Sequence, residues 1–551
     1  MDYQKLAELL FADVTTTIAD LEAKYPPRAL PEGARVTRFA PSPTGYLHLG
    51  GLFGALTDVM TARRSGGVSI LRIEDTDKKR EITAGVTAII SGLDAFGVKF
   101  DEGMTGEDTE QGDYGPYKQS ERVFIYHTVA KELVAKGLAY PCFMTEQELS
   151  DMRAQQEAEG TDIWGCFGKW AKYRDLSYEE VEQRIHAGQP WVLRLRSDGD
   201  ASHRVAFDDM IRGRIEMPEN IIDEVLLKSD GIPTYHFAHV CDDHFMRVTH
   251  AVRGEEWIPS TNKHIAMFKA CGFKPPKYAH SPVIMKIDEN DGTKRKLSKR
   301  KDPEAAVGYF VERGFPKEAL IDYLLTLMNS GFEDWRRANP TQDSYTYQFD
   351  IKKMSVSGCL FDMAKLCDIS KNVISLMSAE EIYGRVAEWA KTYDAELAGA
   401  LTNDPEKAKA IFAIGRGGKK PRKDFAVYSE VRAYIGFFYN EFFAVTDSIG
   451  EHNKDDVTAC LMTYLETYSE ADDKDAWFDK VKAVADKNGY CSDMKAFKAD
   501  PTAYKGSVAD VSGFIRLAVT GRLNSPDLYS VIEIIGKDEM QRRIMSFIKG
   551  M

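Results

Sequence analysis

The sequence has no long apolar run and no basic, apolar leader. None of its stretches approaches the roughly 18 uninterrupted apolar residues that a membrane span needs. The first residues, MDYQKLAELLFADV, place Asp2, Glu8 and Asp13 among the apolar side chains and have no positively charged start, which argues against a signal peptide. We therefore expect a cytoplasmic protein that makes no contact with a membrane.

Paired cysteines and an excess of positive charge are also missing. The eight cysteines form no C-x-x-C or C-x-C pair, which in a soluble chain of 551 residues is typical of reduced, mostly buried thiols. A net charge of −13 argues against nonspecific binding along nucleic acid by bulk attraction. It does not exclude an RNA partner, because such binding needs only a local basic surface. Composition alone leaves the function open.

The first hundred residues predict the start of a parallel sheet. Residues 35–40 (RVTRFA) are typical of a short strand, and a turn-rich stretch, 41–51, leads into a helical stretch that ends near residue 66. A second strand at 68–75 (VSILRIED) and a helical segment at about 82–95 follow. Strand, helix and strand in this order favour a βαβ unit with crossover helices.

Three further stretches differ in pattern. Residues 101–220 predict an inserted α/β subdomain, with helix capping boxes at Thr145/Glu148 and Ser177/Glu180. From Ile221 a β-rich pattern returns in DEVLLKSDGIPTYHF and FMRVTHAVRG, which predicts that the chain re-enters the first sheet. Beyond about residue 330, long amphipathic helices with few strand patterns continue to the end.

The first chemical motif is PSPTGYLHLGG at 41–51, between a predicted strand and a predicted helix. A helix N-terminus offers unpaired N–H groups and a positive dipole end to a phosphate. Gly45, Gly50 and Gly51 would let the backbone pass close to a nucleotide, and His48 could stabilise charge on a phosphate. The alternative is a Pro/Gly turn with a capping histidine, since short motifs arise often by chance.

The second motif is KRKLSKRK at 294–301, which lies between Gly292 and Asp302-Pro303 and is predicted to form a loop. By itself such a basic run indicates a solvated surface or a localisation patch. With a phosphate-type turn earlier in the chain, the two segments could close on a triphosphate from two sides.

Together these motifs resemble the signatures of class I aminoacyl-tRNA synthetases. APSPTGYLHLGG (40–51) is similar to the HIGH signature, and KLSKR (296–300) to the KMSKS signature. The flanking blocks resemble the glutamyl-tRNA synthetase branch, in the same order and with similar spacing across about residues 35–335. These blocks are TRFAPSPTG (37–45), LRIEDTD (71–77), GPYKQSER (115–122), SDGIPTYHFA (229–238), DDH (242–244), RGEEW (253–257) and KLSKRKD (296–302). A fainter resemblance continues at FIRLAVTG (514–521).

The resemblance implies an α/β Rossmann-type catalytic domain with an inserted α/β subdomain, followed by all-α C-terminal anticodon-binding domains. The corresponding ranges are an N-terminal extension (1–34), the catalytic domain with its stem region (35–100 and 221–330), the inserted acceptor-binding subdomain (101–220) and the helical anticodon-binding region (331–551).

The implied reaction is ATP-dependent ligation of L-glutamate to tRNA(Glu) through a glutamyl-adenylate, by a monomer that uses ATP with Mg²⁺. Catalysis would rest on positioning and charge stabilisation. The residues implied to be catalytic are His48, Lys296 and Lys299. Those implied to bind ATP are Gly50, Gly51, Glu256, Trp257, Leu297 and Ser298. Those implied to bind glutamate are Arg38, Ala40, Ser42, Glu74, Tyr235 and Arg253, with Arg80 a weaker candidate and the role of His239 open. Arginine suits this task because its guanidinium meets a carboxylate bidentately.

Two positions depart from the family pattern. The fourth residue of HIGH is Gly51 instead of His, which the glutamate branch tolerates. Some relatives hold zinc in the inserted subdomain through a C-x-C, but position 144 here is Met and Cys166 has no Cys or His partner nearby. We expect no structural zinc, and expect Cys142 and Cys166 to be small core residues.

Two segments outside the signatures have open roles. Leu6, Leu9, Leu10 and Phe11 predict one face of a short helix that packs on the catalytic domain, with an RNA or partner contact as the alternative. Basic residues near three glycines, Arg416, Lys419, Lys420, Arg422 and Lys423, either form a solvated loop or contact tRNA phosphates near the anticodon arm. Arg516 and Arg522 are further tRNA-binding candidates.

The nearest alternative function is glutamine–tRNA ligation. That branch usually carries PPEPNGYLHIGH and VxSKRKL with a β-barrel C-terminal region, whereas APSPTG, KLSKR and a helical C-terminus favour glutamate. A catalytically silent RNA-binding paralogue would show eroded signatures, yet His48, Lys296 and Lys299 are present. The sequence leaves open whether tRNA(Gln) is also charged.

Overall fold

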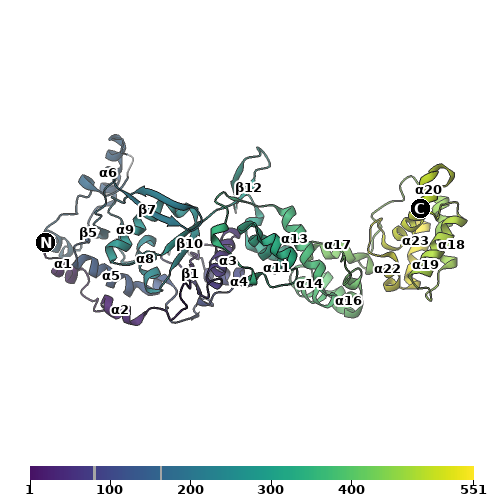
Figure 1. Cartoon of the computed structure of the whole chain (residues 1–551), viewed down its shortest axis with the longest axis horizontal. Helices are drawn as coiled ribbons and strands as arrows, with labels where there is room; N and C mark the ends of the chain where they lie inside the picture. The colour runs from purple at the N-terminus through teal and green to yellow at the C-terminus, as the bar shows by residue number, and fades with distance from the viewer. Residues whose placement is uncertain (78–81, 162–163, 299) are drawn as a thin grey trace. The chain divides into compact units, whose positions relative to one another are not determined.

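The computed structural model describes residues 1–77, 82–161, 164–298 and 300–551 (Figure 1). The chain forms two compact units. The first unit combines Met1–Phe310 with Ile321–Asp362, and the second combines Val311–Leu320 with Met363–Met551. The helices nearest these divisions are α10 (Val307–Arg313), α11 (Lys317–Met328) and α12 (Phe332–Ala338).

The first unit begins with the predicted βαβ arrangement. A four-stranded sheet has the order β1-β2-β3-β4, in which β1 to β3 are parallel and β4 is antiparallel. The strands are β1 (Val36–Phe39), β2 (Val68–Leu71), β3 (Glu102–Met104) and β4 (Glu110–Gln111), and the crossover helices are α3 (Leu49–Arg63) and α4 (Gly85–Asp94). Gly67 lies so near Arg35 that a Cβ there would be 1.9 Å from the Arg35 carbonyl oxygen, so the turn into β2 requires glycine.

After the inserted segment the chain returns beside β1. Strand β10 (His250–Gly254) pairs in parallel with β11 (Lys277–Ser281), and the Thr249 N–H just before β10 donates to the Val36 carbonyl at 3.0 Å. Of the two stretches predicted to be β-rich, 223–237 and 245–254, residues 235–237 and 245 instead belong to α8 (Tyr235–Phe245). Buried Phe237, Cys241 and Phe245 recur every four residues, which is helical spacing. Helix α9 (Thr261–Cys271) lies between β10 and β11 in sequence.

The inserted segment has its own sheets. Strands β5 (Ala139–Cys142), β6 (Val192–Leu195) and β9 (Val225–Leu227) form one antiparallel sheet, and β7 (Arg204–Asp209) with β8 (Gly213–Pro218) forms a hairpin. The helices here are α5 (Val123–Ala135), α6 (Glu146–Ala158) and α7 (Tyr178–His186). Both predicted capping boxes, at the starts of α6 and α7, are confirmed with reciprocal hydrogen bonds.

A second hairpin carries the basic motif. Strand β12 (Ile284–Ile287) pairs antiparallel with β13 (Lys294–Lys296) and parallel with the short β14 (Cys359–Leu360). The prediction of a loop across all of 294–301 is therefore wrong for its first three residues. Their backbone groups pair with β12, so the irregular part begins at Leu297.

The N-terminal extension belongs to the first unit. Helix α1 (Tyr3–Leu10) packs on α5, with Leu6 and Phe11 buried. The Phe11 ring lies 5.9 Å from the ring of His127 on α5. After α2 (Ile18–Lys24), Arg28 forms a bidentate ion pair with Glu102 on β3. Helix α1 thus packs on a helix of the inserted segment rather than on the catalytic domain as predicted. The extension contacts the catalytic domain through α2, where Glu22 binds His244 of α8.

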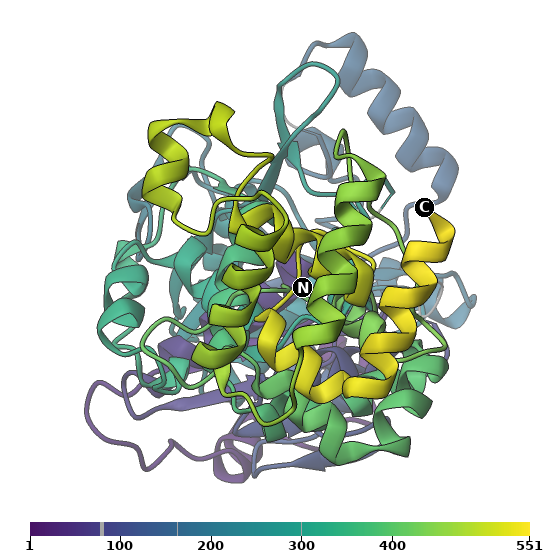
Figure 2. The ribbon, with the colours of Figure 1, turned by 90° about the vertical axis from the view of Figure 1, so that its right-hand side faces the viewer.

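The second unit is built from helices, as Figure 2 shows for the segment coloured yellow-green to yellow. The α-helices after residue 362 are α13 (Met363–Leu376), α14 (Ala379–Tyr393), α15 (Ala395–Asn403), α16 (Pro405–Ala413), α17 (Val431–Ile435), α18 (Lys454–Thr467), α19 (Lys474–Lys487), α20 (Met494–Ala499), α21 (Val508–Thr520), α22 (Leu528–Ile535) and α23 (Lys537–Gly550). Their apolar faces meet in a continuous core that includes Leu401, Val457, Val481 and Ile515. This confirms the predicted helical C-terminal region.

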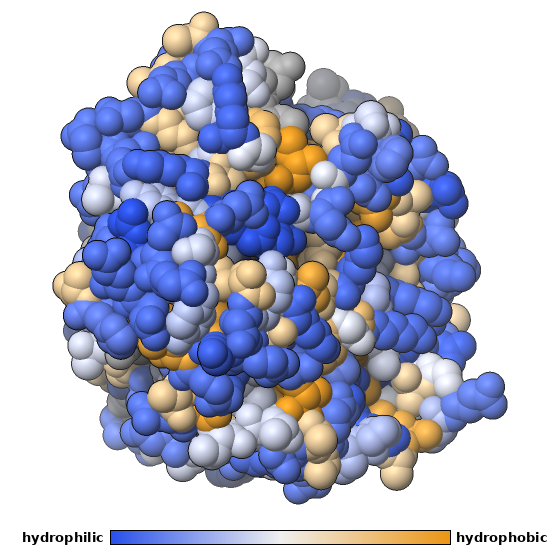
Figure 3. Space-filling view, turned by 90° about the vertical axis from the view of Figure 1, so that its left-hand side faces the viewer, coloured by the Kyte–Doolittle hydropathy of each residue, from blue (hydrophilic) through white to orange (hydrophobic). Residues whose placement is uncertain are grey.

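The face of the molecule in Figure 3 is covered mostly by hydrophilic residues, with hydrophobic ones in scattered groups. Within the described ranges, none of the helices combines the length and apolar character that crossing a membrane requires.

Candidate active site

A cavity of about 1250 Å³ lies in the first unit and is lined by most of the predicted site residues. Those that line it are Arg38, Ala40, Ser42, His48, Gly50, Glu74, Tyr235, Arg253, Glu256, Trp257, Lys296 and Leu297. Gly51 and Ser298 are not among its lining residues. Lys299 and Arg80 lie outside the described residues. The cavity therefore brings both signature motifs and the predicted amino-acid pocket to one place.

His48 is the N-cap of α3. Its Nδ1 accepts a hydrogen bond from the Gly51 N–H at 2.9 Å, so the neutral ring carries its proton on Nε2. The alternative interpretation, a capping histidine, therefore also holds. The capping hydrogen bond fixes the tautomer of His48, and the same side chain lines the cavity. Gly51 acts through its backbone N–H, which orients His48.

Backbone contacts join the first signature segment to the residues that follow the second. The Val307 N–H donates to the Leu47 carbonyl at 3.1 Å, and His48 forms a β-bridge with Ala306. Nearby, the Arg295 guanidinium binds the Asp302 carboxylate bidentately, at 2.6 and 2.8 Å. Asp302 also accepts the Ser298 N–H, at 2.9 Å. Ser298 therefore shapes the loop.

Lys296 differs from its neighbour Arg295 in having no acidic partner. Its side chain lines the cavity, and none of the ion pairs among described residues involves its ammonium group. A cation without a carboxylate partner at a cavity wall is available to an anionic ligand.

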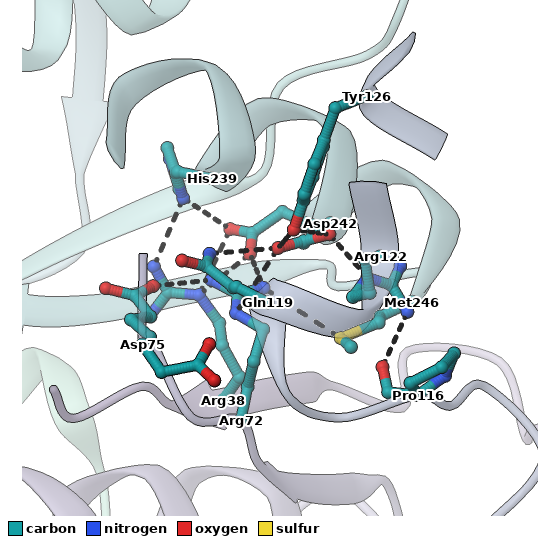
Figure 4. Close-up of polar contacts among 12 residues, drawn as sticks. Arg38, Arg72, Asp75, Pro116, Gln119, Arg122, Tyr126, His239, Asp242 and Met246 are labelled. Carbon is teal, nitrogen blue, oxygen red and sulfur yellow. Dashed lines mark hydrogen bonds and ion pairs between the residues drawn. The ribbon is translucent and has the colours of Figure 1, made fainter. Parts of the chain in front are cut away.

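Arg38 belongs to a buried ionic network, which Figure 4 shows. Its Nε lies 3.1 Å from both carboxylate oxygens of Asp243, and its Nη1 donates to the Val252 carbonyl at 3.2 Å. Arg72, which sequence reasoning missed, binds the same Asp243 at 2.7 Å and Glu74 at 3.1 Å. The adjacent Asp242 is held by Arg122 at 2.6 Å. Arg38 therefore lines the cavity with its charge already matched by a carboxylate of the protein.

Arg253 is buried but has no such partner. Its Nε donates to His280 at 3.0 Å, its Nη1 to His264 at 3.1 Å and its Nη2 to Thr261 at 2.9 Å. Across the described residues no carboxylate forms an ion pair with it, and burial lowers the pKa of its guanidinium. Three of its five N–H groups are used, which leaves one on each terminal nitrogen. Arg253 thus presents an unmatched positive charge at the cavity wall.

Glu74 and Tyr235 line the same cavity as these arginines and carry an acidic and a phenolic group. Burial raises the pKa of Glu74 to about 7, although the Arg72 and Arg38 guanidinium groups act against it. Burial also raises the pKa of Tyr235 to about 12, so the phenol keeps its proton. The Tyr235 ring contacts the Trp257 ring at 4.4 Å and stacks on His239 at 6.1 Å. His239, whose role the sequence left open, lies with its Nδ1 3.2 Å from Asp243.

The lining of the cavity combines cationic and anionic side chains with groups that can bind phosphate. Arg253 with its spare donors, Glu74, His48 and Lys296 all lie on this lining. Such a cavity can hold a zwitterionic amino acid that carries one more carboxylate, next to a polyphosphate.

Comparison with known proteins places the chain in a family. Residues 35–368 match the model of the class I tRNA synthetase (E and Q) catalytic domain, and residues 502–548 match an anticodon-binding domain. A glutamate–tRNA ligase of Clostridium perfringens (strain SM101 / Type A) is 47% identical over 553 residues, which span 100% of both chains. One of Acetivibrio thermocellus is 46% identical over 550 residues, again across 100% of both. The chain belongs to the glutamate–tRNA ligase family of class I tRNA synthetases.

Solved structures of this family have the same fold. A crystal structure of a glutamate tRNA ligase from Elizabethkingia meningosepticum in complex with its amino acid matches with a TM-score of 0.74 at 28% identity, covering 94% of this chain and 99% of that one. The glutamate-tRNA synthetase of Elizabethkingia anophelis matches with a TM-score of 0.73 at 29% identity, covering 94% of this chain and 100% of that one. These matches confirm the predicted fold class for the present chain.

The cysteines of the inserted segment are buried. Cys142 and Cys166 are 2% and 1% exposed, and the Cys166 thiol lies 3.5 Å from the Met144 sulfur. In the part of the chain that the structure describes, no three His, Cys, Asp or Glu side chains gather as metal ligands. Methionine thus occupies the place at which a second thiolate would be needed for a Cys-rich zinc site.

We expect elemental analysis of the purified protein to find less than one zinc per chain, because Cys142 and Cys166 have no third and fourth thiolate or imidazole ligand. The check is the metal content before and after chelation, with glutamate charging measured on the same samples. Stoichiometric zinc that chelation removes together with activity would show that other ligands complete a site.

The basic residues at 416–423 fall into two groups. Arg416 donates to the Ile374 carbonyl at 2.6 Å, and Arg422 pairs with Asp424 at 2.7 Å, so both arginines hold the loop in shape. Lys419, Lys420 and Lys423 are exposed. These residues precede the 502–548 match, whereas Arg516 and Arg522 lie inside it.

Proposed function

We propose that this chain ligates L-glutamate to tRNA(Glu) with ATP, and that the cavity between Arg253 and Lys296 is where glutamyl-adenylate forms. The observation that carries this proposal is the guanidinium of Arg253, without a carboxylate partner among the described residues, in a cavity that residues of both signature motifs also line. The names of the full-length relatives support the choice of amino acid, because they are glutamate–tRNA ligases.

Arg253 would pair with the side-chain carboxylate of glutamate, and Glu74 with its ammonium group. A buried guanidinium gains most from a charged, hydrogen-bonded acceptor, since removing it from water has already been costly. Arg38 would act more weakly than the sequence predicts, because Asp243 holds its Nε. Tyr235 and Ser42 would complete the pocket wall.

Activation requires one bond to form and one to break. A glutamate carboxylate oxygen attacks the α-phosphorus of ATP, and the bond from that phosphorus to the bridging oxygen of pyrophosphate breaks. His48, through its Nε2–H, and the backbone at Gly50 would contact the phosphates from one side. Lys296, with Lys299 as predicted from the sequence, would neutralise the leaving pyrophosphate. Magnesium would enter with ATP and add positive charge at the phosphates.

Transfer of the glutamyl group would need tRNA bound to both units. In the second unit Lys419, Lys420 and Lys423 are the residues we propose to contact tRNA phosphates, because the neighbouring arginines are bound to the protein itself. Arg516 and Arg522 remain proposed contacts within the anticodon-binding match.

We expect kcat/KM for glutamate to rise with pH up to about pH 7 and then to level off. Below the raised pKa of Glu74, its carboxyl is protonated and cannot pair with the substrate ammonium, so the rate should fall about tenfold per pH unit. His236 and His239 titrate below this window, because burial lowers the pKa of each to about 4. The measurement is tRNA-dependent pyrophosphate exchange at saturating ATP, from about pH 5.5 to about pH 8.5.

Glu74→Gln is the matched variant for this profile. It cannot ionise, so its kcat/KM should be low and should not change across that range. A wild-type rate that stays constant below pH 7 would remove Glu74 from the proposed role.

The overall proposal is tested by charging assays with purified tRNA(Glu) and tRNA(Gln), each with labelled glutamate and labelled glutamine. We expect glutamyl-tRNA(Glu) and no glutaminyl product. Glutaminyl-tRNA(Gln) as the main product would establish the alternative ligase instead. The same assay decides whether glutamate is also placed on tRNA(Gln).

A further inference from the structure

Arg253 lies at the centre of a buried hydrogen-bond chain that runs from β7 to α8. Asp209 at the end of β7 binds the Nδ1 of His280 at 2.6 Å, and the Nε2 of His280 faces Arg253 at 3.0 Å. On the other side, Arg253 faces the Nδ1 of His264 at 3.1 Å, and the Nε2 of His264 lies 2.8 Å from His236. Four residues around one arginine thus come from four different elements.

The proton positions along this chain are set by Arg253, which only donates, and are held by Asp209 and His236 as acceptors. A guanidinium only donates, so the Nε2 of His280 and the Nδ1 of His264 must both be acceptors. The proton of His280 is therefore on Nδ1, where it is donated to Asp209, and the proton of His264 is on Nε2, where it is donated to His236. Burial lowers the pKa of His264 well below its usual value and that of His236 to about 4, so both rings are neutral.

The backbone explains why these side chains meet. Arg253 and His280 are direct partners in the parallel β10–β11 ladder. Thr261 and His264 lie three residues apart on α9 and so share one helix face. Arg253 is therefore held by a strand on one side and a helix on the other. His264, His280 and Thr261 are each 0% exposed, which leaves little freedom for another arrangement.

The four donors around Asp209 require a carboxylate at this position. Its Oδ1 accepts the backbone N–H groups of Ile211 and Arg212, at 3.0 and 2.9 Å. Its Oδ2 accepts both the backbone N–H of His280, at 3.0 Å, and the ring proton. An asparagine amide at this position would set its NH₂ against a backbone donor in either orientation. Only an ionised carboxylate satisfies all four donors and keeps the His280 proton on Nδ1.

We propose that His280 and His264 are positioning residues that aim the spare N–H groups of Arg253 at the substrate carboxylate, with Asp209 and His236 fixing their tautomers. The inference rests on the proposed role of Arg253. His280, His264 and Thr261 are neutral acceptors that together bind three N–H groups of the guanidinium. They orient the cation and leave its positive charge for the ligand. A misplacement of about 1 Å at such a contact can cost about 100-fold in rate.

The test is the KM for glutamate, and separately for ATP, in tRNA-dependent pyrophosphate exchange. His280→Leu and His264→Leu remove the acceptors, and we expect each to raise KM for glutamate by about 10- to 100-fold, the range found for groups that orient metal ligands. The KM for ATP should not change. Asp209→Asn should act in the same direction, because it disturbs the tautomer of His280, as the corresponding change does in a Ser-His-Asp triad.

Conservative variants separate orientation from stability. His280→Gln keeps an acceptor near the position of Nε2 and His264→Asn keeps one near Nδ1, so both should recover most of the glutamate affinity. His250→Gln is the matched control, a buried histidine on the same strand that contacts Thr249 and not Arg253. Thermal unfolding of each variant reports any loss of stability.

Two results would overturn the proposal. One is an unchanged KM for glutamate in both leucine variants. The other is a parallel rise of both KM values with no recovery in the conservative variants, which would mean a purely structural role. The variant Arg253→Gln distinguishes a failure of this inference from a failure of the proposed function. If that variant uses glutamate normally, the assignment of Arg253 fails; if it is impaired while the leucine variants are normal, only the positioning role fails.

Discussion

Replacing Arg253 with Gln is expected to lower kcat/KM for glutamate by about 30-fold to about 4,000-fold. This range corresponds to about 2–5 kcal/mol, which is the usual cost of truncating one partner of a buried charge pair. The reason is that the partners of Arg253 among the described residues, His280, His264 and Thr261, are all neutral, so the substrate carboxylate would be its counter-charge. The kcat/KM for glutamine should fall much less, because its amide forms no ion pair with Arg253. The ratio of kcat/KM for glutamate to that for glutamine should therefore decrease.

Two variants serve as controls for this result. Arg253→Lys keeps the charge but loses the planar fork, so it should be intermediate. Arg214→Gln removes an exposed arginine of β8, whose side chain is 66% exposed, and should be neutral. Normal use of glutamate by Arg253→Gln would pass the recognition role to Arg38 or to Arg80.

Replacing Lys296 with Ala should slow amino-acid activation by about 2.7–4 kcal/mol, or about 100- to 1,000-fold, by analogy with the loss of one oxyanion donor. Its side chain lines the cavity and forms no ion pair with an acidic residue that the structure describes, so it can meet charge that develops on the leaving pyrophosphate. Affinity for tRNA should hardly change. Pyrophosphate exchange measures the first effect, and filter binding of labelled tRNA measures the second.

Lys294→Ala is the matched control for Lys296. It is an exposed lysine on the same strand, β13, and it does not line the cavity. Its activation rate should equal that of the wild type. Loss of tRNA affinity with normal activation in Lys296→Ala would show that the hairpin is an RNA-binding patch.

Local patterns predicted the parts of the fold that depend on short-range physics. The capping boxes of Thr145 and Ser177 were predictable because their hydrogen bonds join residues three apart in sequence. The β1-α3-β2 unit was predictable from its succession of strand and helix patterns, although its ladder pairs residues as distant in sequence as Val36 and Val68. Residues 235–237 and 245, the two ends of α8, were misassigned because each lies at the edge of a strand-like run. Strand β13 was hidden by its lysines, whose backbone pairs with β12 whatever their charge.

The site residues likewise divide into those that the sequence could identify and those that only the folded chain shows. His48, Arg253 and Lys296 lie in signature blocks, so the resemblance found them, and the cavity brings them together. The partners of Arg253 could not be found from spacing, because His280 follows it by 27 residues and Asp209, which binds His280, precedes His280 by 71 residues. Asp243 and Arg72 sit inside quoted blocks, but only the folded chain shows that Asp243 takes the charge of Arg38.

The most direct test of the account is the amino-acid selectivity of activation by the wild-type protein with tRNA(Glu) present. A pocket that relies on pairing Arg253 with a carboxylate should activate L-glutamate at least about 10⁴-fold better than L-glutamine, because the amide leaves a buried guanidinium unpaired. L-aspartate, one methylene shorter, should also be activated poorly. Equal or better activation of L-glutamine would contradict the account.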